Sequence, residues 1–299
     1  MITIRNQELS AAFTLQGAEA RSLRDLRTDR EYLWQGDARW WGGSSPILFP
    51  ITGGMWNGET LLHGQPLRIP KHGFAAKCEW TVLEQEEGRV TFALRSDDDA
   101  VKANFADAFP FRYELRVTYS LRGRTLRADI AVENLGDEDL CFQVGGHPGI
   151  ALPGWKEEES VDGYLRFDGD ARHLVRAGEQ GCIEVDAAGE PLQFPLPADA
   201  DGLVPLCVDT FAHEALILCR QVSAATVLDK ARRPVARVSS GAPVWLFWSP
   251  QGVHSPFVCC EPWYGLPDLQ GFRGELSRRP FVQCAAPAAT WRGWYAVEV

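Results

Sequence analysis

The sequence predicts an all-β protein, and three observations carry that prediction. Apolar and polar residues alternate in many short runs, and Gly, Pro, Asp or Ser residues bound those runs. No stretch keeps the 3.6-residue period of a long amphipathic helix. Many short strands separated by turn residues are typical of an antiparallel β-sandwich or a related closed β architecture.

The clearest element is a hairpin. Apolar residues alternate with polar ones from Tyr113 to Leu121, Gly123 supplies a turn, and the alternation resumes from Leu126 to Val132. This pattern predicts two antiparallel strands with one buried face. Shorter runs of the same kind predict further strands at 89–94, 215–218, 225–228, 235–238 and 244–248.

Two segments interrupt the strand pattern: Pro148–Lys156, which is rich in Pro and Gly, and Leu192–Pro205, which is rich in Pro and Asp and contains a Gly. Either could be a linker between domains. However, the unusual motifs described below lie on both sides of the second break. A site shared by them favours one domain over residues 1–299.

Composition excludes some classes of partner. The 299 residues carry a formal net charge of -10, and the arginines are scattered among acids, so we expect no nucleic-acid partner. The first residues show no cationic segment followed by an apolar one, and no segment approaches the ~20 apolar residues that cross a bilayer. The sequence therefore predicts a cytoplasmic protein without a membrane partner. It carries no signal for an oligomeric state.

The eight cysteines form no CxxC pair. We interpret most of them, including the neighbours Cys259 and Cys260, as small buried apolar residues. The sequence accordingly predicts neither a disulfide nor a structural metal site.

Two histidines and a glutamate occur in unusual settings. His72 lies in KHGFA (71–75), His147 in GGHPG (145–149), and Glu261 in CEPWYG (260–265). If the fold brings them together, the site holds the groups that a reaction with one proton donor and one acceptor needs near neutral pH. Each residue also has a structural interpretation: a turn histidine bound to a carbonyl, or a glutamate that caps a turn or pairs with an arginine. A third possibility is a metal triad of the three residues.

Glu261 follows an apolar run, Pro256–Cys260, and precedes Pro262 and Trp263. A carboxylate at the end of a buried strand is costly unless it is paired or used, and desolvation there raises its pKa. Trp263 is either a core residue or an apolar plate for a ligand, and the same alternatives apply to Trp34, Trp40, Trp41 and Trp56.

Four segments together resemble a known family. They are SSPILFPITGG (44–54), KHGFA (71–75), GGHPG (145–149) and FVCCEPWYG (257–265). In this order they are similar to successive motifs of the aldose 1-epimerase (galactose mutarotase-like) family, in particular its LacX-like branch. The resemblance implies a single-domain antiparallel β-supersandwich, with a small-molecule sugar bound in an open groove on the concave face.

The resemblance also implies roles for individual residues. His147 matches the family's general acid, Glu261 its general base, and His72 a residue that binds the sugar near its ring oxygen. We expect Lys71 and Trp263 to contribute to sugar binding, and we expect no cofactor and no metal. Before reaction Glu261 is expected to be a carboxylate and His147 an imidazolium.

One family feature is absent. An arginine that is common in the family is Gly43 or Gly54 here, and the basic residues near the motifs that could replace it are Lys71, Arg68 and Lys77. The implied activity is the interconversion of the α and β anomers of a free aldohexose or related sugar by acid–base ring opening. The alternative, suggested by the missing arginine, is a carbohydrate-binding or regulatory protein of the same fold with little or no turnover.

Overall fold

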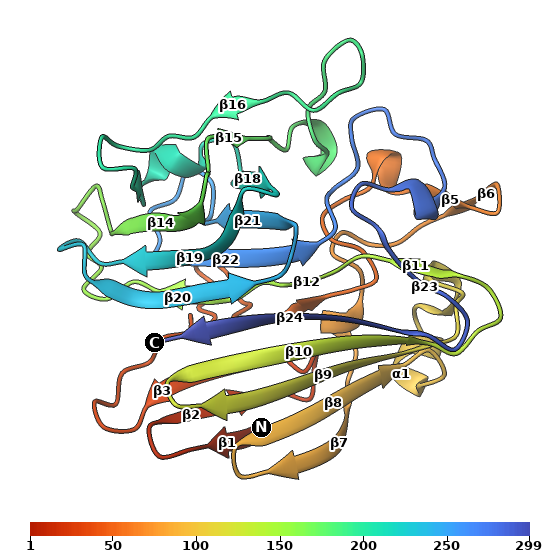
Figure 1. Cartoon of the computed structure of the whole chain (residues 1–299), viewed down its shortest axis with the longest axis horizontal. Coiled ribbons are helices and arrows are strands. Elements are labelled where there is room, and N and C mark those ends of the chain that lie inside the picture. The colour runs from red at the N-terminus through yellow and green to blue at the C-terminus, as the bar shows by residue number, and fades with distance from the viewer.

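The computed structural model describes residues 1–299, and its regular secondary structure is almost entirely antiparallel strands, joined by long loops (Figure 1). Two large sheets, of nine and six strands, form its body. The helical segments are short: α1 spans Asp99–Lys102, and the 3₁₀ turns are η1 (Trp56–Gly58), η2 (Ala75–Lys77), η3 (Ala106–Ala108), η4 (Glu179–Gly181), η5 (Val208–Phe211) and η6 (Leu276–Arg278). No helix combines the length and the apolar character that crossing a bilayer requires. The predicted all-β class is confirmed.

The larger sheet contains nine strands. They are β7 (Thr81–Glu86), β8 (Arg89–Arg95), β9 (Tyr113–Arg122), β10 (Thr125–Asn134), β14 (Tyr164–Gly169), β17 (Val204–Pro205), β19 (Val222–Leu228), β20 (Pro234–Ser240) and β24 (Thr290–Glu298). Their order in the sheet is β17-β14-β19-β20-β24-β10-β9-β8-β7. The predicted hairpin is β9–β10: Leu121 pairs with Leu126, and Gly123 in the turn has a positive φ of 52°.

The smaller sheet contains six strands and carries most of the candidate site. They are β4 (Ile47–Leu48), β12 (Val144–Gly146), β13 (Gly149–Ala151), β18 (Ala215–Cys219), β21 (Val244–Trp248) and β22 (Phe257–Tyr264). Their order is β18-β21-β22-β12-β4, and β13 also pairs with β22. The expected break at Pro148–Lys156 is therefore partly wrong, because β13 lies inside it. Its local sequence is too short and glycine-rich to show alternation.

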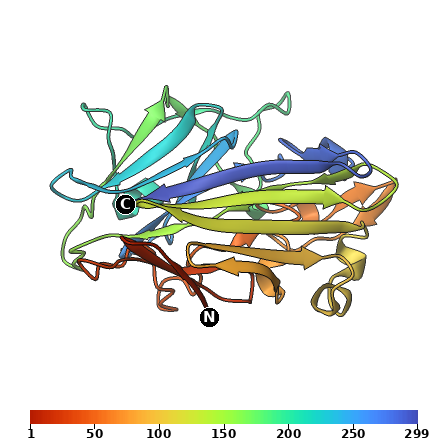
Figure 2. The same ribbon diagram turned by 60° about the horizontal axis from the view of Figure 1, so that its bottom comes forward.

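The remaining strands form small sheets. They are β1 (Ile2–Arg5), β2 (Leu9–Phe13) and β3 (Ala20–Asp25) in one sheet, and the pairs β5 (Thr60–Leu62) with β6 (Gln65–Leu67), β11 (Leu140–Phe142) with β23 (Gln283–Ala285), and β15 (His173–Leu174) with β16 (Phe194–Pro195). The N-terminal strands, red in Figure 2, lie beside β8 and β9. There Phe13 packs against Phe92 and Tyr119.

Strand alternation divides β21 and β22 between two environments. Trp245, Phe247 and Cys260 belong to a cluster of 61 buried residues that also contains side chains of the nine-stranded sheet. Leu246 and Trp263 point to the opposite face and belong to a separate, smaller cluster. Because successive side chains of a strand alternate in direction, Glu261 shares that second face with Trp263.

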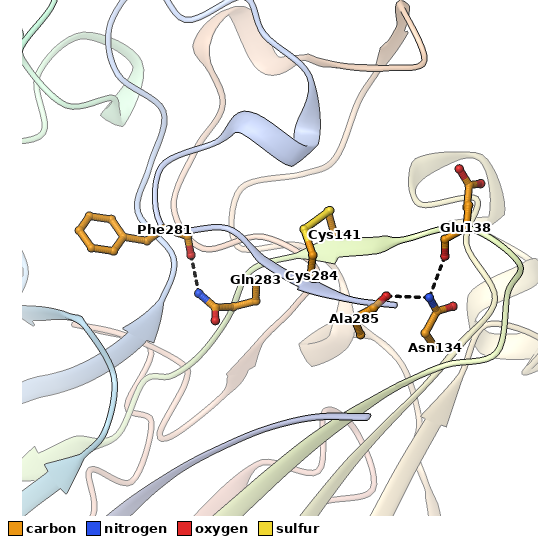
Figure 3. The surroundings of a disulfide bond; sticks show 7 residues. All are labelled: Asn134, Glu138, Cys141, Phe281, Gln283, Cys284 and Ala285. Atoms are coloured by element: carbon orange, nitrogen blue, oxygen red, sulfur yellow. Dashed lines mark hydrogen bonds between the residues drawn. A yellow bond between two sulfur atoms is a disulfide. The ribbon is translucent and has the colours of Figure 1, made fainter. Parts of the chain in front are cut away.

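The structure contradicts the expectation of no disulfide. Cys141 of β11 and Cys284 of β23 lie directly opposite one another in the antiparallel register and form a disulfide, with Cα atoms 4.1 Å apart (Figure 3). Asn134 Nδ2 donates to the carbonyl oxygens of Glu138 and Ala285 beside it. The two cysteines are 143 residues apart, so no local spacing indicates the pair. Of the six free cysteines, the buried ones conform to the packing interpretation: Cys78, Cys182, Cys259 and Cys260.

Candidate active site

A cavity of about 320 Å³ opens on the outer face of the six-stranded sheet, a volume in the range of small-molecule sites. All five residues selected from the sequence line it: Lys71, His72, His147, Glu261 and Trp263. Three motifs that are far apart in sequence therefore meet in one place.

Glu261 lies in β22, opposite Leu246 of β21. Its side chain is 0% exposed, and neither carboxylate oxygen has a hydrogen-bond partner. No arginine pairs with it, so the interpretation as a structural ion pair is wrong. An unpaired buried carboxyl group is costly and calls for an explanation.

His147 is brought to Glu261 by an interruption in the strand ladder. Strand β12 ends at Gly146 and β13 begins at Gly149, and both pair with β22, so His147 and Pro148 leave the ladder opposite Glu261. The flanking glycines are required by packing. A Cβ atom at Gly145 would lie 2.6 Å from the Trp263 ring, and one at Gly146 would lie 2.5 Å from the Tyr295 ring. Aromatic rings therefore occupy the space that a side chain at Gly145 or Gly146 would need.

His147 and Glu261 form a close pair, with Nε2 3.1 Å from Oε2. Burial raises the pKa of Glu261 well above its ordinary value of 4.5. Burial also lowers the pKa of His147, to about 3. Both shifts disfavour the charged forms, and together they favour a neutral pair with the shared proton on the carboxyl group. The expectation of a carboxylate and an imidazolium before reaction differs from this, because it considered the desolvation of Glu261 but not that of His147.

His72 is held by the backbone of the 53–54 loop. The His72 ring atom Nδ1 accepts a hydrogen bond from the backbone N–H of Gly53 at 3.2 Å, and the backbone N–H of His72 donates to the Gly53 carbonyl oxygen at 2.9 Å. Burial, with the nearby His147 and Lys71, lowers the pKa of His72 well below 6.5. The neutral imidazole with Nδ1 as acceptor carries its proton on Nε2. His72 can thus donate a hydrogen bond from Nε2.

Three tryptophans surround the pair in different ways. Trp41 stacks on His147 with ring centroids 4.7 Å apart, and Trp248 approaches His147 edge-on at 6.0 Å. Trp263 is only 1% exposed and contacts His72 edge-on at 5.5 Å. Trp263 is therefore mainly a core residue, and Trp248 is the more accessible aromatic wall. The sequence did not single out Trp248, although it lies on the same face of its predicted strand as Leu246.

At the rim of the cavity, Lys71 Nζ lies 2.9 Å from Glu214 Oε1. Both side chains are partly exposed and both line the cavity. No sequence motif indicates Glu214, which lies just before β18 and has a positive φ of 70°.

The two glycines at the family's arginine positions have different surroundings. A Cβ atom at Gly43 would lie 2.5 Å from the Trp41 ring, so an arginine there would displace the ring that stacks on His147. At Gly54 the nearest atom is the Gln180 carbonyl oxygen at 3.2 Å.

Of the three basic residues considered as replacements, only Lys71 lines the cavity. Arg68 lies 3.5 Å from Glu59 with an 81% exposed side chain, and Lys77 is exposed on η2.

The three residues proposed from the sequence as a metal triad are not the three whose ligand atoms lie closest together in the structure. The potential ligand atoms that lie within 4.8 Å of one another belong to His147, Cys259 and Glu261, so the third member is a thiol and not the His72 imidazole. Cys259 does not line the cavity. The groups of this cluster that line the open space are the His147 imidazole and the Glu261 carboxyl group.

Comparison with known proteins identifies relatives of the chain. Residues 1–269 match the aldose 1-epimerase family. The chain is 29% identical over 308 residues to the chromosomal LacX protein of Lactococcus lactis subsp. lactis, covering 100% of this chain and 99% of that protein.

Solved structures give the same result. A galactose mutarotase related enzyme from Lactobacillus acidophilus superposes with a TM-score of 0.87 at 26% identity, covering 99% of this chain and 96% of that one. A galactose mutarotase-like protein from Lactobacillus casei superposes with a TM-score of 0.86 at 27% identity, covering 100% and 99%. With most of its length matched, the chain belongs to the aldose 1-epimerase family.

Proposed function

We propose that this protein is a mutarotase that interconverts the α and β anomers of a free aldohexose or a related sugar. The observation that carries the proposal is the pair at the cavity floor. Glu261 is fully buried without a hydrogen-bond partner, and one of its oxygens lies 3.1 Å from His147 Nε2. A family of aldose 1-epimerases supplies the reaction class to which such a pair is suited.

Ring opening of a pyranose needs a base that takes the proton of the anomeric hydroxyl and an acid that protonates the ring oxygen. The exocyclic C–O bond becomes a carbonyl as the ring C–O bond breaks, and reclosure on the other face gives the other anomer. A pair that holds one proton can serve both roles. In the ion-pair form Glu261 accepts and His147 donates, and reclosure reverses the transfers.

Other cavity residues fit the binding of a polar ring. The Nε2–H of His72 is a donor for a ring or hydroxyl oxygen, because its Nδ1 is already engaged by Gly53. Trp248 offers an apolar surface for the C–H face of a sugar. Lys71 and Glu214 offer a donor and an acceptor at the rim.

The test is anomeric exchange of freshly dissolved α-glucose and α-galactose, followed by polarimetry and by NMR, with and without a chelator. The proposal predicts exchange well above the spontaneous rate and unchanged by the chelator. Loss of exchange with chelator would favour a metal-dependent site. Sugar binding without exchange on any sugar of a broad panel would favour the carbohydrate-binding alternative.

A further inference from the structure

Behind the cavity lies a buried ion pair that the acid–base chemistry does not use. Arg279 follows η6, and its side chain and that of Asp268 are both 0% exposed. Arg279 Nε donates to Asp268 Oδ1 at 2.6 Å, and Arg279 Nη2 donates to the carbonyl oxygen of Gly54 at 3.0 Å. Asp268 Oδ2 accepts from the Trp56 N–H at 3.0 Å. The pair therefore forms hydrogen bonds with the main chain on both sides of Met55, at the Gly54 carbonyl and at the Trp56 N–H.

The loop that Arg279 contacts, Gly53–Gly54, is also the loop that forms hydrogen bonds with His72. Gly53 donates to His72 Nδ1 and accepts from the His72 N–H, and its carbonyl is adjacent to Gly54. Gly53 also packs closely on Pro267, where an added Cβ atom would lie 2.4 Å from the ring. Arg279 is thus connected to His72 through one carbonyl and one peptide unit.

Stability alone does not account for this pair. A fully buried ion pair loses much of its attraction to desolvation, and replacing both partners with apolar residues is often neutral or stabilising. Arg279 Nη1 is also buried without a partner. The guanidinium holds its two partners in a fixed relative position, because its planar group donates to Asp268 and to the Gly54 carbonyl at once. A lysine ammonium on a flexible side chain does this poorly.

We propose that Arg279, oriented by Asp268, is a positioning residue that fixes the Gly53–Gly54 loop and thereby keeps His72 in the tautomer with its proton on Nε2, facing the cavity. The Arg279 guanidinium does not line the cavity; it contacts the carbonyl oxygen of Gly54, one of the two positions where the family commonly has an arginine. The value of this tautomer for sugar binding rests on the proposed function, but the positioning itself does not.

The decisive measurement is the ¹⁵N NMR signature of the His72 imidazole at pH 8, where a histidine without a partner is neutral and samples both tautomers. Four proteins are compared: wild type, Arg279→Lys, the double variant Arg279→Met with Asp268→Leu, and Arg278→Lys as a control at the exposed neighbouring arginine. Wild type and the control should show an unprotonated Nδ1 and a protonated Nε2. Both Arg279 variants should move towards the average of the two tautomers. The double variant removes both buried charges, so its fold is expected to persist.

Kinetics give a second, separable readout. Loss of an aligned His72 donor should raise KM for the sugar by about five- to tenfold, the range of one hydrogen bond, with kcat changed by less than about twofold. Folded Arg279 variants whose His72 signature matches wild type would overturn the positioning role. Wild type that exchanges no sugar would defeat the proposed function, while the NMR comparison would still decide the role of Arg279.

Discussion

Two carboxylates on two strands of this molecule have opposite surroundings. Glu114 on β9 of the nine-stranded sheet is 7% exposed and lies between Arg95, at 2.6 Å, and Arg116, with which it also pairs. Glu261 on β22 of the six-stranded sheet is 0% exposed, pairs with no arginine or lysine, and lies 3.1 Å from the His147 imidazole.

The comparison separates two uses of a buried charge. Glu114 is neutralised by two guanidinium groups, as expected where a carboxylate serves packing and pairing. Glu261 keeps the cost of burial without that compensation, which is the condition that shifts a pKa into a catalytically useful range. If this difference between Glu114 and Glu261 is correct, substitutions at the cavity should affect exchange far more than substitutions elsewhere.

Removing the partner of Glu261 should have the largest effect. We expect His147→Asn to lower the rate of anomeric exchange by roughly 10²–10⁴, the scale of general acid–base catalysis. If the two residues act as one unit, the double variant with Glu261→Gln should lose much less than the product of the two single losses. Exchange rates measured by NMR for all four proteins test this, and strictly multiplicative losses would show that the residues act independently.

The disulfide should affect stability and leave the chemistry unchanged. Replacing Cys141 and Cys284 by alanine should lower the free energy of unfolding by about 2–4 kcal/mol, because it releases a long closed loop in the unfolded chain. Denaturant titration measures this free energy, and anomeric exchange by the variant should stay within about twofold of wild type. In the same titration, wild type should unfold in one cooperative transition over residues 1–299. A large loss of exchange in a folded variant would mean that β11 and β23 influence the cavity.

The stability of Glu261→Gln should depend on pH differently from that of wild type. Unfolded Glu261 loses its proton above about pH 4.5, whereas burial makes the folded protein retain it, so rising pH favours the unfolded state of wild type. Glu261→Gln lacks this effect, and its stability relative to wild type should grow by up to about 1.4 kcal/mol per pH unit above pH 5, until the folded carboxyl group ionises. Denaturant titrations at pH 5, 6, 7 and 8 check the slope. A stability difference between Glu261→Gln and wild type that stays constant from pH 5 to pH 8 would contradict a raised pKa for Glu261.

The smallest effect should come from the aromatic wall. Trp248→Ala should raise KM by about fivefold, since an aromatic contact is worth roughly 1 kcal/mol beyond buried area, with a smaller change in kcat. Trp294 is the matched control, because it lies on the nine-stranded sheet under Arg127 and away from the cavity. Equal effects of Trp248→Ala and Trp294→Ala would rule out a specific sugar contact at Trp248.

The sequence was sufficient where the signal is local. The β9–β10 hairpin follows from alternation over ten residues per strand and a glycine turn. His72, His147 and Glu261 were selected because each lies in an unusual local motif, and the structure places all three around one cavity.

What the sequence could not provide depends on contacts between distant segments. The Cys141–Cys284 pair exists only in the register of β11 with β23. Glu214, Trp248 and Arg279 reach the site region through strand pairing and loop packing that no motif records. The pKa shifts of Glu261 and His147 depend on how completely both groups are removed from water, which no local motif records.

The most direct test compares two glutamate-to-glutamine variants side by side. Each replacement keeps the size of the side chain and removes one carboxyl group. The rate constant of α–β exchange, measured by NMR on the most rapidly converted sugar, should fall by roughly 10²–10⁴ for Glu261→Gln and stay within about twofold of wild type for Glu114→Gln. Near-normal exchange by folded Glu261→Gln would contradict the proposed mechanism.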